Sequence, residues 1–295
     1  MILIFEHGRF GNQLFQFNFC LKFLRKDEKI IFLGFNELSK FIKKDKKFIF
    51  ISKKNILIKI LLRYRNFLCK IIKKLKVISY IYENDNQKLI IKNGIFNKFL
   101  LINGFFQREK YVIKNFSSFL KKSSIESKAI QLIKSIKKNN KQKIFFVHIR
   151  LTDGITNPSK KYPAVLPLSW FFKCKHILKK KFKNCKFIYL SDDLKYLKEN
   201  FKNEMYIKNK ELFFNFFLMK NCDGGILSPS TFSWWACYLA KHKGNFYAPK
   251  HWIGHKRRKT FPKFIETSFI KYEPVLKKEY MTALRNEHKF YTINF

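Results

Sequence analysis

Three apolar segments in the second half of the chain each end in polar or charged side chains that could bind or position a charged ligand. Arginine forms paired hydrogen bonds with phosphate, and hydroxyls and carboxylates position such a ligand or the loops around it. Such residues at three segment ends in series predict a site for a phosphorylated ligand. In chain order they are His148, Arg150 and Asp153 in "KIFFVHIRLTD", Ser191, Asp192 and Asp193 in "KFIYLSDD", and Ser228, Ser230 and Thr231 in "GGILSPST".

A parallel sheet would bring these residues together, because its ligands bind outside the carboxyl ends of the strands. Ser230 or Thr231 is expected to cap a helix over "TFSWWACYL", whose first amides would then point to the same crevice. The two tryptophans of that helix are expected to pack in the core. The chain contains neither G-x-G-x-x-G nor G-x-x-x-x-G-K, so the usual dinucleotide and nucleoside triphosphate signatures are absent.

Strands alternate with helices along residues 143–252, which predicts a doubly wound parallel sheet. The expected helices cover "PLSWFFKCKHILKKKF", "LKYLKENF", "ELFFNFFLMKNC" and "TFSWWACYLAKH", and the last expected strand is "NFYAPKHW". The polar end of residues 124–142, where a helix runs into a linker, is the predicted domain boundary.

The N-terminal stretch "GRFGNQLFQF" follows the short apolar strand "MILIF". Its glycines predict a tight turn, and a buried helix is expected from Leu14 onward. Such a turn brings backbone amides close to whatever lies there. The polar pair Asn12 and Gln13 favours a binding role over a plain connection between a strand and a helix.

The composition limits the partners. A net charge of +42 permits contact with nucleic acid, an anionic membrane or an anionic substrate. A nucleic-acid-binding protein would carry its cations on one face among exposed aromatics, whereas these phenylalanines lie in apolar periodic segments. We therefore expect no nucleic acid. The six cysteines form no C-x-x-C pair, which favours buried free thiols over a zinc site.

Residues 55–76 predict one or two amphipathic basic helices, with Lys59, Arg63, Lys70 and Lys74 near one face. Such a face could lie on an anionic membrane or be solvated. No apolar run reaches the ~20 residues of a spanning helix, and the N-terminus lacks a secretory signal. The expected location is cytoplasmic, peripheral on the inner face of the membrane.

The sequence resembles the glycosyltransferase family 11 fucosyltransferases. The resemblance rests on "GRFGNQLFQF", "GFFQREKY", "HIRLTD", "YLSDDLKYLKENF", "SPSTFSWWACYL" and "APKHW", which follow one another from residue 3 to about 252. "STFSWW" is the most specific of them. The common family form H-I-R-R-G-D differs here, because Leu151 and Thr152 replace the second arginine and the glycine. This lost charge leaves another GDP-sugar or another acceptor linkage as the alternative.

The resemblance implies an α/β chain of the GT-B type, with two Rossmann-like lobes and a central cleft. Residues 1–140 would form the acceptor-side lobe and residues 141–260 the lobe that binds the GDP-sugar. Residues 261–295 would form a tail that packs back on the lobes. The implied reaction is inverting transfer of L-fucose from GDP-β-L-fucose to a hydroxyl, galactose O2, of a cell-surface glycan acceptor. No metal or other cofactor is expected.

The resemblance also implies roles for individual residues. Arg150 and the helix start after Ser230 would stabilise the departing GDP, and Asp153 would orient Arg150 or its loop. Asn12 would meet the sugar or the acceptor hydroxyl. The expected catalytic residues are thus Arg150, Asn12 and Asp153, and the expected donor-binding residues are Gly11, His148, Arg150, Asp192, Asp193, Ser228, Ser230, Thr231 and Phe232.

Overall fold

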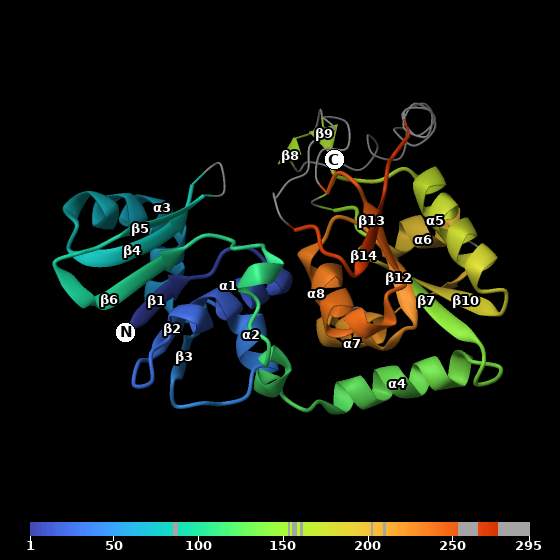
Figure 1. Ribbon diagram of the computed structural model, residues 1–295, viewed down its shortest axis with the longest axis horizontal. Coiled ribbons are helices and arrows are strands. Elements are labelled where there is room, and N and C mark those ends of the chain that lie inside the picture. Colours follow the sequence, from blue (N-terminus) through green and yellow to red (C-terminus); the bar gives the residue numbers. More distant parts are fainter. Residues whose placement is uncertain are drawn as a thin grey trace. The chain divides into compact units, whose positions relative to one another are not determined.

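A computed structural model of the chain describes residues 1–84, 88–152, 154, 158–159, 162–201, 203–208, 211–252 and 265–276. The chain forms two compact units, Met1–Lys121 and Lys122–Phe295 (Figure 1). No helix among the described residues is both long enough and apolar enough to cross a bilayer.

The described part of the first unit contains a six-stranded sheet in the order β3-β2-β1-β6-β4-β5. All neighbours are parallel except β4 and β5, which are antiparallel. Strands β1 and β2, inside the sheet, are mostly buried, as parallel strands are when helices cover both faces, whereas β3 and β5 at the edges are partly exposed. The strands are β1 (Ile2–Phe5), β2 (Ile30–Leu33), β3 (Phe48–Ile51), β4 (Ile78–Glu83), β5 (Leu89–Lys92) and β6 (Phe96–Asn103).

Helices cover the two faces of this sheet. Phe17 of α1 (Phe10–Phe23) packs on Phe32 and Phe48 of one face, and α2 (Asn36–Phe41) lies beside α1. On the other face, α3 (Ile56–Leu75) joins a core cluster with side chains of β1, β2, β4 and β6. The turns η1 (Glu109–Tyr111) and η2 (Phe116–Phe119) follow β6.

The described part of the second unit contains a parallel six-stranded sheet in the order β11-β10-β7-β12-β13-β14. Two short strands, β8 (Pro158–Ser159) and β9 (Tyr162–Pro163), pair separately. The strands of the main sheet are β7 (Lys143–Ile149), β10 (Cys185–Ser191), β11 (Met205–Tyr206), β12 (Gly224–Leu227), β13 (Phe246–Pro249) and β14 (Ile270–Glu273).

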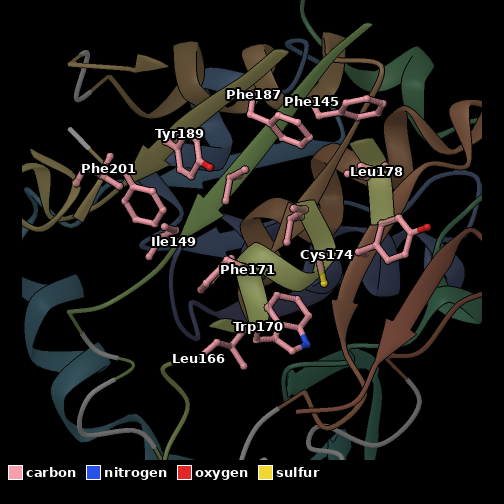
Figure 2. Close-up of a cluster of buried hydrophobic side chains, with 14 of the residues drawn as sticks. Phe145, Ile149, Leu166, Trp170, Phe171, Cys174, Leu178, Phe187, Tyr189 and Phe201 are labelled. Carbon is pink, nitrogen blue, oxygen red and sulfur yellow. The ribbon is translucent and has the colours of Figure 1, made fainter. Parts of the chain in front are cut away.

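Alternating side chains of β7 face different helices. Phe145, Val147 and Ile149 join a core with Trp170 and Phe171 (Figure 2). His148 points to the opposite face, because successive residues of a strand alternate, and its ring lies near Phe232. The helices of this unit are α4 (Ser124–Ile136), α5 (Leu168–Lys181), α6 (Leu194–Asn200), α7 (Leu212–Asn221), α8 (Thr231–Leu239) and the turn η3 (Lys241–Lys243).

The elements predicted for residues 143–252 are confirmed, and residues 55–76 form one helix. Two features differ from the sequence prediction. Helix α1 begins at Phe10, so Gly11 and Asn12 lie in its first turn and not in the preceding turn. The division between the units falls at Lys121, whereas the sequence placed it at 140, because α4 packs on α7 of the second unit. The predicted tail 261–295 lies largely outside the described residues.

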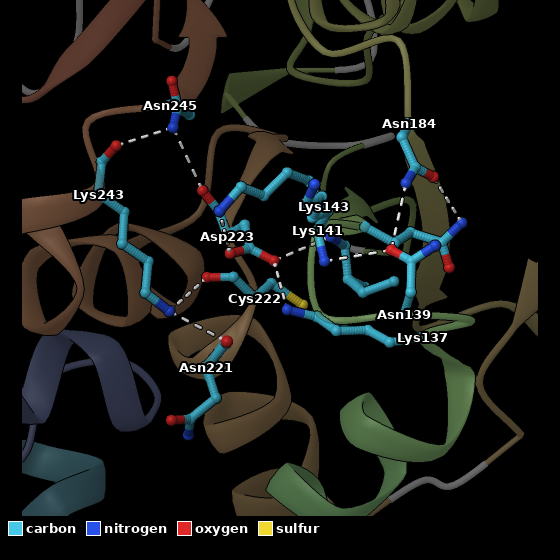
Figure 3. Close-up of polar contacts among 12 residues, drawn as sticks. Lys137, Asn139, Lys141, Lys143, Asn184, Asn221, Cys222, Asp223, Lys243 and Asn245 are labelled. Atoms are coloured by element: carbon cyan, nitrogen blue, oxygen red, sulfur yellow. Dashed lines mark hydrogen bonds and ion pairs between the residues drawn. The ribbon is translucent and has the colours of Figure 1, made fainter.

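A polar network fixes the amino-terminal ends of β7 and β12 (Figure 3). Asp223 accepts a hydrogen bond from the Ile144 amide (2.9 Å), and Lys137 and Lys143 lie 3.2 Å and 3.4 Å from its carboxylate. Nearby, Lys243 donates to the carbonyls of Asn221 and Cys222, at the end of α7. Burial alone would raise the pKa of Asp223, but the amide and the lysines outweigh it and hold that pKa below its ordinary value.

We expect Asp223→Asn to destabilise the protein by roughly 1–3 kcal/mol at neutral pH, the usual worth of hydrogen bonds to a charged group. Because the pKa of Asp223 is lower in the folded protein than in the unfolded chain, its carboxylate stabilises the fold above pH 3.8, the ordinary pKa. This stabilisation is lost as the pH falls through the pKa of the folded state. The difference between variant and parent should therefore shrink below about pH 4. Urea unfolding at pH 7, 5 and 3 checks this, with Asp27→Asn, on an exposed turn, as the control. A difference that is constant with pH would contradict it.

Candidate active site

The structure places the three predicted strand ends side by side in the second unit. Strand β7 lies between β10 and β12. His148 is in register with Leu190 of β10 and with Leu227 of β12. Because all three strands are parallel, their polar ends emerge at one edge of the sheet.

Ser228 connects two of these strand ends. Its amide donates to the His148 carbonyl (3.0 Å), and its hydroxyl oxygen accepts a hydrogen bond from the Arg150 amide (3.0 Å). The residue is 1% exposed. Ser228 therefore fixes the backbone from which the Arg150 side chain leaves the strand.

Asp192 holds the next residues of the same loop. One carboxylate oxygen accepts from the Leu151 amide (2.9 Å), and the other accepts from the Thr152 hydroxyl (2.6 Å). The two residues that depart from the common family form are thus both bound by Asp192. Asp193 instead caps α6 by accepting from the Tyr196 amide (3.0 Å). The expected donor contacts of both aspartates remain predictions.

His148 is buried and electrically neutral. Burial, assisted by the neighbouring Arg150 and opposed by Asp192, lowers its pKa from 6.5 to about 4. Its Nδ1 is buried without a hydrogen-bond partner among the described residues. At neutral pH the imidazole can donate or accept a hydrogen bond, and of the described residues at these three strand ends Arg150 carries the positive charge.

Helix α8 begins directly after β12. Ser230 occupies the N-cap position, as predicted, but its hydroxyl makes no capping hydrogen bond. Thr231 and Phe232 form the first turn and are partly exposed. Trp234 and Trp235 are fully buried, as the sequence predicted for core residues. The amino-terminal end of α8 therefore adjoins Ser228 at the edge that carries Arg150.

Asp153, predicted to orient Arg150, lies outside the described residues. Within the part of the chain that the structure describes, no three His, Cys, Asp or Glu side chains gather in a way that could hold a metal ion.

In the first unit, the turn before α1 depends on Gly8. Its φ of +74° is in the left-handed region, and a Cβ there would lie 2.1 Å from Nδ2 of Asn12. Asn12 accepts a hydrogen bond from the Gln107 side chain (2.6 Å). Gly8 thus makes room for the Asn12 amide, and Gln107 orients it. Gly11, one residue earlier, is buried inside the helix.

Sequence reasoning gave no role to Gln107, although it lies in the quoted motif "GFFQREKY". It also left out His7, which directly precedes the glycine turn. Burial, together with the neighbouring Arg65, lowers the pKa of His7 to about 4. The position of His7 next to "GRFGNQ" was the available signal, but spacing along the chain does not reveal burial.

Solved structures with a similar course of the chain include two transferases. Fucosyltransferase NodZ from Bradyrhizobium matches with a TM-score of 0.47 and 13% identity, over 81% of this chain and 91% of that chain. A variant of FUT1 from Arabidopsis thaliana, in complex with GDP, matches with a TM-score of 0.48 and 10% identity, over 81% and 68%.

Two curated proteins of Escherichia coli are similar in sequence. The alpha-1,2-colitosyltransferase is 27% identical over 226 residues, which are 71% of this chain and 74% of the relative. The O-antigen biosynthesis glycosyltransferase WbnK is 30% identical over 115 residues, and this match spans 38% of its length.

The family assignment rests on a match along most of the chain. The sequence model of Glycosyl transferase family 11 matches residues 1–271, which include both units' motifs. Two α/β units with parallel sheets also confirm the predicted fold class, GT-B. The chain therefore belongs to glycosyl transferase family 11 and is a glycosyltransferase.

Proposed function

We propose that this glycosyltransferase moves L-fucose from GDP-β-L-fucose to a hydroxyl group of a glycan, with inversion and without a metal ion. One observation carries the proposal: Ser228 fixes Arg150 at the edge of the sheet where α8 begins. An arginine at a strand end that adjoins a helix N-terminus is suited to binding a pyrophosphate.

The leaving group explains why these groups are needed. When the bond between fucose C1 and the β-phosphate oxygen breaks, that phosphate gains negative charge and the sugar becomes oxocarbenium-like. The acceptor oxygen forms the new bond to C1 as the bond to the β-phosphate oxygen breaks, and its proton passes to water. Arg150 and the first amides of α8 would stabilise the phosphate charge. Because His148 is neutral, it would contact the nucleotide without sharing this task.

Asp192 and Thr152 support the same task. In this chain, Asp192 binds the loop after β7 through both oxygens, one of them to the Thr152 hydroxyl. That contact restrains the loop that carries Arg150. We infer that Asp192 acts as a positioning residue, and that Thr152 holds the loop where the common family form has arginine and glycine.

Asn12 would orient the transferred sugar or the acceptor hydroxyl. Gly8 leaves room for its amide, and Gln107 fixes that amide by donating to its oxygen. A side chain fixed in this way suits orientation of a reacting group better than binding of charge.

The acceptor that we propose is galactose O2 of a cell-surface glycan. The colitosyltransferase relative forms an alpha-1,2 linkage by its name, and WbnK acts in O-antigen biosynthesis by its name. The same relative favours a second candidate donor. Colitose is fucose without its 3-hydroxyl group, so GDP-colitose is the alternative that the sequence similarity supports.

A donor assay tests the proposed function. We expect GDP-fucose to support transfer to galactose-ended oligosaccharides, with the product linkage assigned by NMR, and we expect EDTA to leave the rate unchanged. GDP-colitose and GDP-mannose are compared at equal concentration. Faster transfer from GDP-colitose would favour the second candidate. Loss of activity in EDTA that Mn²⁺ restores would contradict the metal-free mechanism.

We expect Arg150→Lys to lower turnover by roughly 10²–10³-fold, because lysine keeps the charge but loses the paired hydrogen bonds. Asn12→Ala should keep GDP affinity and lose turnover, since Asn12 faces the sugar. Calorimetry with GDP and steady-state kinetics separate the two effects. Arg25→Lys and Asn115→Ala, at exposed positions, are the controls. Loss of GDP binding in Asn12→Ala with retention in Arg150→Lys would reverse the assigned roles.

Ser228→Ala tests whether Arg150 depends on its backbone partner. The variant removes the acceptor of the Arg150 amide, so we expect weaker GDP binding and roughly tenfold lower turnover, from about 1.5 kcal/mol of lost hydrogen bonding. Ser135→Ala removes an exposed serine hydroxyl near the carboxyl end of α4, which leads to the amino end of β7, and should change neither quantity. Normal GDP binding and turnover in Ser228→Ala would show that the loop holds Arg150 without it.

A further inference from the structure

Helix α3 of the first unit has two apolar faces, and only one of them is covered. Ile58, Leu61, Leu62, Cys69 and Ile72 pack into the core cluster against the sheet. Their spacings of three, one, seven and three residues place them on one face of a helix. This face accounts for the attachment of α3 to the unit.

The second apolar face is exposed. Phe67 is 61% exposed and Leu75 is 60% exposed, although both are large apolar side chains. The spacing of the exposed apolar residues is four, four, three, four and four, so they form one continuous stripe along the helix. The members of this apolar stripe are Ile56, Ile60, Tyr64, Phe67, Ile71 and Leu75.

A row of cations runs beside the apolar stripe. Lys59, Arg63, Lys70 and Lys74 each directly precede a stripe residue, which places them along one border of it. All four are exposed. The helix contains no acidic residue. Arg65 does not belong to this row, because it donates to the Glu6 carbonyl (2.9 Å).

More exposed apolar side chains follow the end of the helix. Val77 and Ile95 are 38% and 77% exposed. The Ile95 amide donates to the Lys76 carbonyl (3.0 Å), and the Phe96 amide donates to the Val77 carbonyl (2.8 Å). These backbone bonds attach the start of β6 to the carboxyl end of α3, where the apolar stripe ends.

We propose that α3 binds the surface of an anionic lipid bilayer. The apolar stripe would enter the boundary between headgroups and acyl chains, and the row of cations would meet the lipid phosphates. Charge complementarity favours this occupant over a second copy, which would bring another row of cations and no carboxylate from the helix to pair with them. The proposal does not depend on the identity of the donor sugar.

Vesicle sedimentation tests the proposal on the full chain. We expect binding to phosphatidylcholine vesicles that contain phosphatidylglycerol, weaker binding at high salt, and little binding to phosphatidylcholine alone. Lys59→Gln with Lys70→Gln should weaken binding about 25-fold, roughly fivefold for each cation. Lys179→Gln with Lys180→Gln, exposed on α5, removes the same charge and should leave binding nearly unchanged. Equal losses in the two pairs would overturn the proposal, since net charge alone would then explain binding.

The apolar stripe is tested separately. Ile60→Gln with Phe67→Gln should weaken vesicle binding roughly tenfold or more, whereas Phe172→Gln, at a 45% exposed position of α5, should not. The four native tryptophans are buried, so Tyr64→Trp adds an exposed reporter whose emission should shift to the blue on vesicles and be quenched by brominated lipid. Unquenched emission would overturn the proposal. So would a dimer in solution that Phe67→Gln dissociates.

Discussion

The hydroxyl of Ser228 joins the ends of two neighbouring strands where the site of the second unit is built. It accepts from the Arg150 amide, and the Ser228 amide donates to the His148 carbonyl. Beyond the end of a strand, the backbone is no longer fixed by hydrogen bonds to a neighbouring strand. The direction of a side chain there depends on contacts such as these. With Asp192 binding the next two amino acids of the loop, the backbone around Arg150 is held from β10 and from β12.

The strand ends of the second unit that form the site carry few positive charges, although the chain as a whole is strongly basic. Burial keeps His148 neutral, and Leu151 and Thr152 stand where the common family form supplies another arginine. Among the described residues of the three strand ends, Arg150 and the start of α8 would then serve the electrostatic task of the proposed reaction. A group fixed before the reaction needs little reorganisation when charge develops, which is the usual source of strong electrostatic stabilisation.

Lysines elsewhere in the second unit make structural contacts. Lys137 and Lys143 lie beside Asp223 at the opposite ends of the strands. Lys243 donates to carbonyls at the carboxyl end of α7, where a positive charge interacts favourably with the helix dipole. These contacts are local and need no ligand. The row of cations on α3 differs, because the helix offers it no carboxylate and the neighbouring apolar stripe remains exposed.

The sequence alone determined the main helices and strands of residues 143–249, the fold class and the family, because strong periodicity and specific motifs are local properties, but it did not show the short strands β8, β9 and β11 or the strand β14. It also placed Arg150, Ser228 and Ser230 at strand ends. It did not determine that α1 begins at Phe10, because a glycine is tolerated in the first turn of a helix as well as in the turn before it.

The partner of Asn12 came from tertiary structure, because Gln107 is distant in sequence. The clearest case is α3, whose sequence has apolar residues on two faces and so fits the sheet in either orientation. Only packing decided that Ile58 and Cys69 are buried while Phe67 is exposed. Periodicity identifies apolar faces, but which face is covered depends on the surface that the rest of the fold presents to it.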